Sequence, residues 1–265
     1  MSDSTILIEE REGILMITLN RPEVMNAFNL KMISEVSSAL DRAEKDRNIK
    51  VVIITAAGKV FCAGADLKEI QVFFEGGRVN SRKFDAFSQT LNCMLKKIER
   101  LKKPVIAAIN GYALAGGLEL VMVCDLAICS EKAWLGDQHA NVGLLPASGG
   151  TQRLPRIIGL RKAKELLLTG DMITAEEAGR LGLVNRVVRH DDLLVAAIEM
   201  AEKIVSKSPV ATEALKGVIY DGMHVDLSTA LELERGAVLR HHGTEDIKEG
   251  INSFLEKRKP VFGGK

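Results

Sequence analysis

The sequence predicts an α/β fold, in which a core of parallel strands and helices is followed by a helical C-terminal third. Two observations predict this class. Short continuous apolar runs, typical of strands buried on both faces, alternate with helical patterns through about residue 150. After Gly149 almost every segment has the spacing of an amphipathic helix. The 265 residues suit one large domain, or one domain with a small appendage.

The first predicted elements are a β-hairpin, a helix and a buried strand. Two apolar runs around the triplet REG predict the hairpin over residues 6–20. Asn29 is suited to cap the helix that follows, because its side chain can accept a hydrogen bond from a free backbone N–H. The apolar face of this helix consists of Met32, Ile33, Val36, Leu40 and Ala43. The run VVIITAA (51–57) then predicts a strand buried on both faces.

The rest of the core alternates in the same way. Residues 83–102 predict a helix, PVIAAIN from Pro104 a buried strand, GLELVMVC a further helix and DLAICS a strand. In the C-terminal third one strand-like piece, LVNRVV, interrupts a series of helices predicted at 160–168, 174–181, 191–206, 209–222, 226–241 and 244–257. No low-complexity linker separates the two parts of the chain.

The composition excludes several classes of function. A net charge of +1 shows none of the basic excess of a nucleic-acid binder. No apolar run approaches the roughly 20 residues that span a bilayer, and the N-terminus lacks the pattern of a secretory signal. Because none of the four cysteines forms a CxxC pair, we expect buried thiols and no metal site at Cys62, Cys93, Cys124 and Cys129. We therefore expect a cytoplasmic protein with no nucleic-acid or membrane partner.

Two glycine-rich turns follow predicted strands. FCAGADLKEI (61–70) comes after the strand at 51–57, and NGYALAGGLELVMVCD (110–125) leads into a helix that begins near Gly116 or Gly117. Small residues let the backbone approach a ligand, and a helix N-terminus offers free N–H groups. Donors from both turns aimed at one point would form an oxyanion hole, although most such turns serve only chain geometry. Neither turn matches the dinucleotide fingerprint or the phosphate loop, which argues against a nucleotide site of those types.

Glu119 lies near the start of the helix that follows the second turn, in a run of large apolar residues. Burial of a carboxylate there is costly, and it would raise the pKa of Glu119 toward the range useful for acid–base catalysis. The alternative is a partly exposed first-turn glutamate that the helix dipole favours. The residues alone favour neither interpretation.

Five ordered motifs resemble those of the crotonase superfamily, and most closely its enoyl-CoA hydratase branch. They are LNRPEVMNAF, FCAGADLKEI, KPVIAAINGYALAGGLELVMVCDLAI, GLLPASGGTQRLPRIIG and LTGDMITAEEAGRLGLVNRVV. The resemblance covers about residues 5–260. It implies a spiral of ββα units over residues 1–200, which carries the CoA and active sites, and a helical C-terminal trimerisation region over residues 201–265.

The resemblance also implies the substrate and the residues that bind it. The substrate is an acyl-CoA thioester, so CoA is part of the substrate and no separate cofactor is expected. The backbone N–H groups of Ala65 and Gly116 match the pair that holds the thioester oxygen, and a donor of this kind is worth about 3 to 4 kcal/mol in other enzymes. Lys257 matches a basic residue that approaches CoA, often from a neighbouring subunit of a homotrimer or a hexamer made of two trimers. The residues matched to CoA binding are Ala63, Ala65, Asp66, Leu67, Lys68, Gly116 and Lys257.

His139 is where this chain departs from the family pattern. In hydratases that it resembles, two glutamates position a water and move protons, so that water adds to the β-carbon of a trans-2-enoyl-CoA and the α-carbon is protonated. Glu119 matches the first glutamate, but His139 stands where the second is usual. An imidazole titrates near neutral pH and can donate or accept a hydrogen bond, so His139 is itself a candidate catalytic residue.

Four explanations of His139 stay open. It could hold the water in a hydratase that relies on Glu119, or Asp137 could supply the missing carboxylate or orient the imidazole, since residues i and i+2 of an extended segment face the same side. The reaction could instead be hydrolysis of a thioester or cleavage of a carbon–carbon bond, with an isomerase less favoured because isomerases usually keep the glutamate. Finally, the protein could bind acyl-CoA without turnover. Acyl-chain specificity resides in the stretch 71–90, where Phe73 and Phe74 either line the acyl tunnel or pack a helix.

Overall fold

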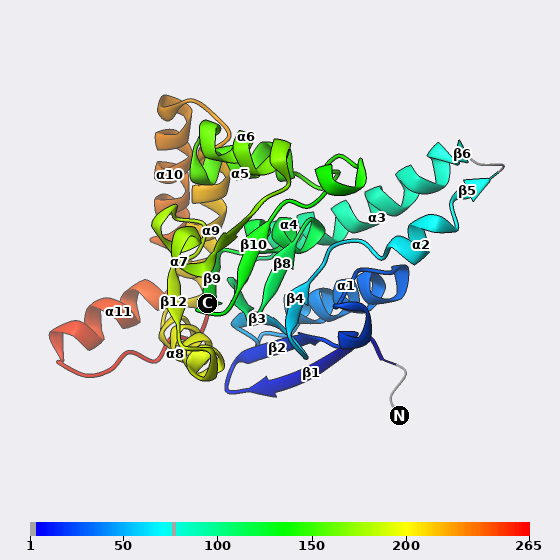
Figure 1. Cartoon of the computed structure of the whole chain (residues 1–265). Coiled ribbons are helices and arrows are strands. Elements are labelled where there is room, and N and C mark those ends of the chain that lie inside the picture. Colours follow the sequence, from blue (N-terminus) through cyan, green and yellow to red (C-terminus); the bar gives the residue numbers. More distant parts are fainter. Residues whose placement is uncertain (1–3, 76–77) are drawn as a thin grey trace.

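Two sheets form the centre of the computed structural model, which describes residues 4–75 and 78–265 (Figure 1). The larger sheet has the strand order β1-β2-β3-β7-β9-β12, and all its pairs are parallel except the β1–β2 hairpin. Its strands are β1 (Ile6–Arg11), β2 (Ile14–Leu19), β3 (Val51–Ala56), β7 (Val105–Ile109), β9 (Leu126–Ser130) and β12 (Arg186–Val188). The predicted α/β class and N-terminal hairpin are thus confirmed.

The smaller sheet has the order β11-β10-β8-β4. Its strands are β4 (Val60–Cys62), β8 (Tyr112–Leu114), β10 (Trp134–Gly136) and β11 (Met172–Thr174). The pairs β4–β8 and β8–β10 are parallel, whereas β10–β11 is antiparallel. A further two-stranded pair joins β5 (Phe74–Glu75) to β6 (Arg78–Val79).

Three successive ββα units supply three strands to each of these sheets and confirm the predicted spiral. Each unit gives one strand to the larger sheet and the next to the smaller sheet, and then turns into a helix. The units are β3–β4 with α2 (Leu67–Gln71) and α3 (Ser81–Arg100), β7–β8 with α4 (Gly116–Val123), and β9–β10 with α5 (Gly150–Ile158). Because β4, β8 and β10 are parallel, the turns that follow them meet at one edge of the smaller sheet.

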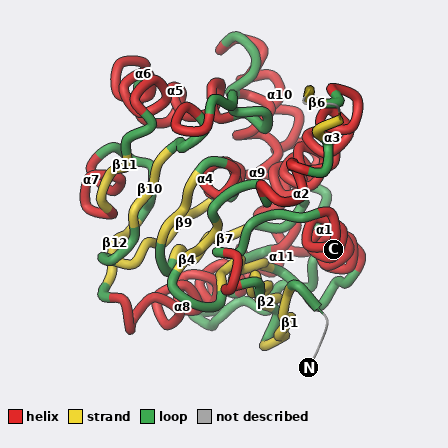
Figure 2. Tube along the Cα trace, turned by 45° about the vertical axis from the view of Figure 1, so that its right-hand side comes forward, coloured by secondary structure: helices red, strands yellow, loops and turns green. Residues whose placement is uncertain are grey.

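The central strands β3, β7 and β9 of the larger sheet are buried on both faces, as their continuous apolar runs predict. On one face Leu193, Ala197 and Ala201 of α8 (Leu193–Val205) pack against the strands. The other face packs against α1 (Leu30–Lys45), α3 and α4. Figure 2 shows α8 along one side of the strands and α5 and α6 (Leu160–Thr169) on the other. The predicted cap of α1 is confirmed, since the side chain of Asn29 accepts a hydrogen bond of 2.9 Å from the amide of Met32.

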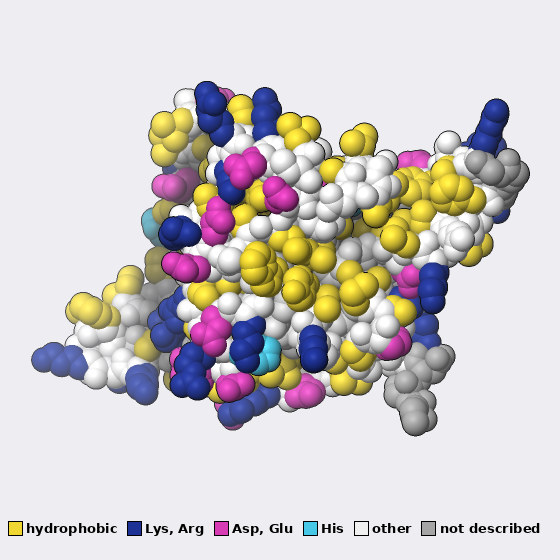
Figure 3. Space-filling model, viewed as in Figure 1, with side chains coloured by type: hydrophobic (Ala, Val, Ile, Leu, Met, Phe, Trp, Pro, Cys, Tyr) yellow, Lys and Arg dark blue, Asp and Glu magenta, His cyan; other side chains and the backbone are white. Residues whose placement is uncertain are grey.

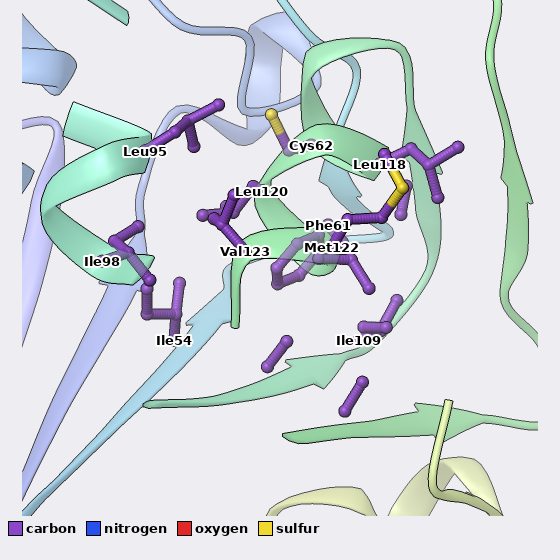
Figure 4. Close-up of a cluster of buried hydrophobic side chains, with 14 of the residues drawn as sticks. Ile54, Phe61, Cys62, Leu95, Ile98, Ile109, Leu118, Leu120, Met122 and Val123 are labelled. Carbon is purple, nitrogen blue, oxygen red and sulfur yellow. The ribbon is translucent and has the colours of Figure 1, made fainter. Parts of the chain in front are cut away.

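Helix α4 is buried on every side, which carries Glu119 into the interior. Figure 4 shows its apolar residues among side chains from α3, β3, β4 and β7. The helix touches β4 directly, because a Cβ on Gly117 would lie 2.1 Å from the carbonyl oxygen of Cys62. Only a glycine permits this approach. The sequence predicted a helix that begins near Gly116 or Gly117, and the structure confirms it, with α4 beginning at Gly116.

The C-terminal helices lie to one side of the sheets (Figure 1). They are α7 (Ala175–Arg180), α9 (Pro209–Gly222), α10 (Leu227–His241) and α11 (Glu245–Leu255), the last of which projects from the body. The boundary expected at residue 200 falls inside α8, a helix that packs on the larger sheet. No helix in the described ranges is long and apolar enough to cross a membrane.

One expectation about the cysteines is wrong. Cys62 and Cys129 are buried and Cys124 is half-buried, but Cys93 is exposed. Cys93 lies on α3, an amphipathic helix whose buried face is made by other residues, so its side chain is left in solvent. Burial raises the pKa of the Cys62 thiol to about 12, which keeps it protonated at neutral pH.

Candidate active site

A cavity of about 510 Å³ opens at the edge of the smaller sheet where the turns after β4, β8 and β10 meet. The structure brings almost every predicted site residue to this cavity. Those that line it are Ala63, Ala65, Asp66, Leu67, Lys68, Gly116, Glu119 and His139. Lys257 does not line the cavity, because it follows α11 on the projecting arm.

The two glycine turns touch each other at the cavity. A Cβ built on Gly116 would lie 3.2 Å from the Cα of Gly64 and 3.7 Å from the amide nitrogen of Ala65. Among the described residues, the amides of Ala65 and Gly116 have no backbone acceptor. Ala115 lies at φ 49° and ψ −117°, a strained conformation for a residue with a side chain. The two free N–H groups are therefore neighbours, as an oxyanion hole requires.

Both carboxylate oxygens of Asp66 form hydrogen bonds within the protein that shape the first turn. Its Oδ2 accepts a hydrogen bond of 3.0 Å from Nη2 of Arg21, and its Oδ1 accepts one of 3.0 Å from the amide of Lys68. The second bond caps the short helix α2. Arg21 also donates to the carbonyl of Ala27, so this turn is tied to the segment before α1.

Glu119 is held by the backbone at the start of α5. Its side chain is 2% exposed, and its Oε1 accepts hydrogen bonds of 2.9 Å from the amide of Ser148 and 2.8 Å from that of Gly150. The other oxygen, Oε2, accepts no hydrogen bond from the described residues. Burial raises the pKa of Glu119 above its usual range, against the opposing effects of the Gly150 bond and the His139 charge. A raised pKa suits a group that takes up and returns a proton.

His139 forms a pair with Asp137, at the point where the chain departs from the family pattern. The two side chains are joined between Nδ1 of the imidazole and Oδ1 of the carboxylate, 2.9 Å apart. Asp137 is fully buried, and its Oδ2 has no hydrogen-bond partner among the described residues. The pair places the Nδ1 proton of His139 on the side of Asp137 and leaves Nε2 free for a ligand in the cavity.

His139 and Glu119 are coupled by charge. Burial pushes the pKa of His139 down, but the hydrogen bond and charge of Asp137, together with the charge of Glu119, outweigh it, so the pKa is raised. An imidazolium and a carboxylate therefore stabilise each other across the site. A Cβ built on Gly150 would lie 3.1 Å from Oδ2 of Asp137 and 3.3 Å from Oε1 of Glu119, which places both carboxylates around the start of α5.

The apolar wall of the cavity comes from α3 and from the segment after β10. Phe84, Phe87 and Leu91 of α3 line the cavity. Val142 and Leu144, which belong to the segment after β10, line it as well. Neither candidate for the acyl tunnel contributes to this wall. Phe73 packs against Phe87 with ring centroids 6.0 Å apart, and Phe74 is exposed on β5. Gly76 and Gly77, in the same variable stretch, lie outside the described residues.

Sequence reasoning missed the groups that hold Glu119. The amides of Ser148 and Gly150 belong to the segment ASGG, and its glycines were the available signal for a helix start that binds an anion. Arg153 was also missed; it contacts this turn from the opposite side. Among the residues that the structure describes, no three His, Cys, Asp or Glu side chains are grouped to hold a metal ion.

The chain is similar to known proteins over nearly its whole length. The family model for enoyl-CoA hydratase/isomerase matches residues 9–265. The chain is 41% identical to a short-chain-enoyl-CoA hydratase of Clostridium acetobutylicum, over 98% of this chain and 97% of the relative. It is 40% identical to a crotonyl-CoA hydratase of Syntrophomonas wolfei, over 99% of each. The crystal structure of an enoyl-CoA hydratase from Bacillus anthracis superposes with a TM-score of 0.94 at 40% identity, covering 99% of this chain and all of that one.

Proposed function

The chain belongs to the enoyl-CoA hydratase/isomerase family, and we propose that it is a hydro-lyase that adds water to short trans-2-enoyl-CoA thioesters. One observation supports this reaction above others. A buried carboxylate, Glu119, and an imidazole, His139, line the same cavity as two unpaired backbone N–H groups. Those are the groups that hydration of an enoyl thioester needs.

The N–H groups of Ala65 and Gly116 act first in the proposed mechanism. They donate to the thioester oxygen, on which negative charge develops as water attacks the β-carbon. Donors held rigidly at this point stabilise the enolate without having to reorganise. The strained turn at Ala115 fixes one of them in advance.

Glu119 and His139 then move the protons. The reaction begins with Glu119 as a carboxylate and His139 as an imidazolium. Glu119 takes a proton from the attacking water, and the resulting hydroxide adds to the β-carbon. His139 gives a proton to the α-carbon, so the product is the 3-hydroxyacyl-CoA and both groups become neutral. A proton transfer from Glu119 to His139 restores the starting state. The raised pKa values of both groups suit this exchange.

Crotonyl-CoA tests the proposal. We expect loss of the enoyl-thioester absorbance together with formation of 3-hydroxybutyryl-CoA, identified by mass spectrometry. If the folded protein binds crotonyl-CoA but forms no hydroxyacyl product, the hydratase assignment is wrong and a binding role without turnover takes its place.

The His139–Asp137 pair favours one alternative, hydrolysis of an acyl-CoA thioester. An imidazole oriented by a carboxylate can activate water toward the thioester carbonyl, which the same N–H groups would hold. A hydrolase would release free CoA from saturated thioesters such as butyryl-CoA, and a thiol reagent detects that release. A hydratase keeps the thioester bond intact and therefore releases no free CoA thiol.

We also propose that the active form is a homotrimer or a hexamer of two trimers, located in the cytoplasm. The arm formed by α11 supports assembly, because Phe254 is 82% exposed and Leu255 is 72% exposed. Figure 3 shows hydrophobic side chains on this arm as well as across the middle of the displayed face. Docking of the arm on another copy would bury these side chains and bring Lys257 toward the CoA of that copy.

A further inference from the structure

The turn that holds Glu119 is itself held from behind by Arg153. Nη1 of Arg153 donates a hydrogen bond of 2.8 Å to the carbonyl oxygen of Ser148. The amide of the same residue donates to Oε1 of Glu119 at 2.9 Å. The Ser148 residue is therefore fixed at both ends, with Arg153 on one side and the proposed catalytic carboxylate on the other.

Gly149 shows how closely Arg153 packs on this turn. It lies at φ 106°, in the left-handed region that favours glycine. A Cβ at this position would lie 1.8 Å from Nη1 of Arg153. The guanidinium therefore occupies the space that a side chain on the turn would need, and the turn is shaped around it.

Arg153 is in turn held by a pair of bonds to Glu99 of α3. Nε and Nη2 each donate a hydrogen bond of 2.8 Å, one to each carboxylate oxygen. This forked geometry fixes the plane of the guanidinium, which a single bond would not do. Burial raises the pKa of Glu99, but the bonds and charge of Arg153 outweigh it, so the pKa is lowered and the carboxylate stays ionised.

Helix α9 of the C-terminal region joins the same network through Tyr220. Its hydroxyl donates a hydrogen bond of 3.1 Å to Oε2 of Glu99. The guanidinium of Arg100 lies 4.0 Å from the centre of the Tyr220 ring and holds the ring in place. A continuous chain of polar contacts thus runs from α9 through Glu99 and Arg153 to Glu119.

We propose that Arg153 is a positioning residue for the reaction, which sets the orientation of the Ser148 amide and thereby of the Glu119 carboxylate, with Glu99 and Tyr220 holding Arg153 in turn. This inference rests on the proposed role of Glu119. Arg153 does not line the substrate cavity, so it acts through the turn and not by contact with the substrate.

The charges around Glu119 predict how loss of Arg153 changes the pKa of Glu119. His139 and Asp137 face it from the segment after β10, and Arg153 faces it from α5. Loss of Arg153 removes a positive charge and frees the Ser148 amide to turn away. Both changes disfavour the ionised carboxylate, so the pKa of Glu119 rises further.

The test compares Arg153→Gln with Arg156→Gln, a matched variant on the same helix. Arg156 is exposed and, among the residues that the structure describes, it donates only to Gln152 one turn earlier. We expect Arg153→Gln to lower kcat for crotonyl-CoA by about 10- to 100-fold, with KM changed by less than about threefold, because misplacement of a reacting group affects mainly the chemical step. Arg156→Gln should match the parent protein. Equal kcat values in the two variants would overturn the proposal.

A direct measurement separates this inference from the hydratase assignment. The pKa of Glu119 is read by NMR on protein with ¹³C-labelled glutamate carboxyls, with Glu119→Gln to assign the signal. We expect a higher pKa in Arg153→Gln than in the parent protein, whether or not crotonyl-CoA is the substrate. An unchanged pKa in a folded variant contradicts the positioning role.

Glu99→Gln supplies a second variant in case Arg153→Gln does not fold. The amide keeps one acceptor for Arg153 but loses the forked pair, so we expect a smaller loss of kcat and a rise in the Glu119 pKa in the same direction. The variant that combines Glu99→Gln with Arg153→Gln should have the same kcat as Arg153→Gln alone, because both substitutions act on the same turn. If the fold-losses of kcat in the two single variants multiply in the double variant, the two residues do not act through one chain of contacts.

Discussion

At the scale of single residues, Glu119 sits inside an apolar helix with two backbone donors on one oxygen. Its raised pKa means that the folded state binds the proton more tightly than the unfolded chain does. The free energy of unfolding therefore falls as the pH rises from 4.5, the ordinary pKa of a glutamate, through the raised pKa of Glu119. The ionised carboxylate that the reaction needs is thus the form that the fold favours less.

Glu119→Gln should therefore separate activity from stability. We expect crotonyl-CoA hydration to fall by about 10²- to 10⁴-fold, as for loss of a general acid–base group. The melting temperature at neutral pH should equal or exceed that of the parent protein, because a neutral amide still accepts both N–H bonds. Activity assays and thermal melts check the two halves. Turnover close to that of the parent protein would remove Glu119 from the mechanism.

Asp137→Asn should reveal what the carboxylate does for His139. The hydrogen bond and charge of Asp137 raise the pKa of His139, so the neutral amide lowers that pKa and moves the fall in kcat at high pH to lower pH. We expect kcat to drop by roughly 10²-fold, with KM nearly unchanged. A pH profile of kcat measures both effects. If the profile does not move, Asp137 serves only to pack the loop.

The pairing of these two residues was only partly predictable. Their spacing of two residues suggested that they share a side, and the structure shows that Asp137 is hydrogen-bonded to His139 but does not line the cavity beside it. The contacts of Glu119 with Ser148 and Gly150 could not be read from the sequence, because 29 and 31 residues separate the partners. Contacts of that kind depend on how the units of the spiral stack.

At the scale of elements, the buried strands and capped helices followed from sequence, but the smaller sheet did not follow from pattern alone. Its strands β4, β8, β10 and β11 have three residues each, too few to show a periodicity. Helix α5 was expected only in that the chain after Gly149 was predicted to be almost wholly helical; no range was predicted for it, and it contains Pro155, a residue usually taken as a helix breaker. The resemblance to the crotonase family supplied the ββα spiral that periodicity could not.

Gly117→Ala tests the direct contact between α4 and β4. The added Cβ would lie 2.1 Å from the carbonyl oxygen of Cys62, so one of two backbones must move. We expect a loss of more than about 3 kcal/mol of stability, measured by chemical denaturation. The control is Gly217→Ala on α9, where a Cβ meets nothing within 4 Å. That change should stabilise by roughly 0.5–1 kcal/mol, and equal effects in the two variants would contradict the packing argument.

At the scale of the whole molecule, parallel strands bring three turns to one sheet edge, so residues as far apart in the sequence as Ala63 and Ser148 meet in one cavity. Family and fold could be predicted from the ordered motifs, since three of the five motifs contain these turns. Lys257 shows the limit of a single chain, because it follows α11 and does not line the cavity of its own chain, whereas the resemblance implies that such a residue often approaches CoA from a neighbouring subunit.

Replacement of Phe254 by Glu and Leu255 by Lys should weaken assembly. These exposed apolar side chains lie at the end of α11. Charged side chains there would not lower the stability of an isolated chain, but they would prevent burial of this surface against another copy. Light scattering should show a trimer or hexamer for the parent protein and smaller species for the double variant. A monomeric parent protein would contradict the proposed assembly.

The projecting arm has a further consequence for how the protein responds to dilution. If its apolar face is completed only by another copy, each chain is stabilised by its neighbours according to mass action. The melting temperature should then rise with protein concentration, and activity per chain should decay when a concentrated stock is diluted into an assay. The amount of protein made by the cell would in that case set not only the number of active sites but also the fraction of them that work.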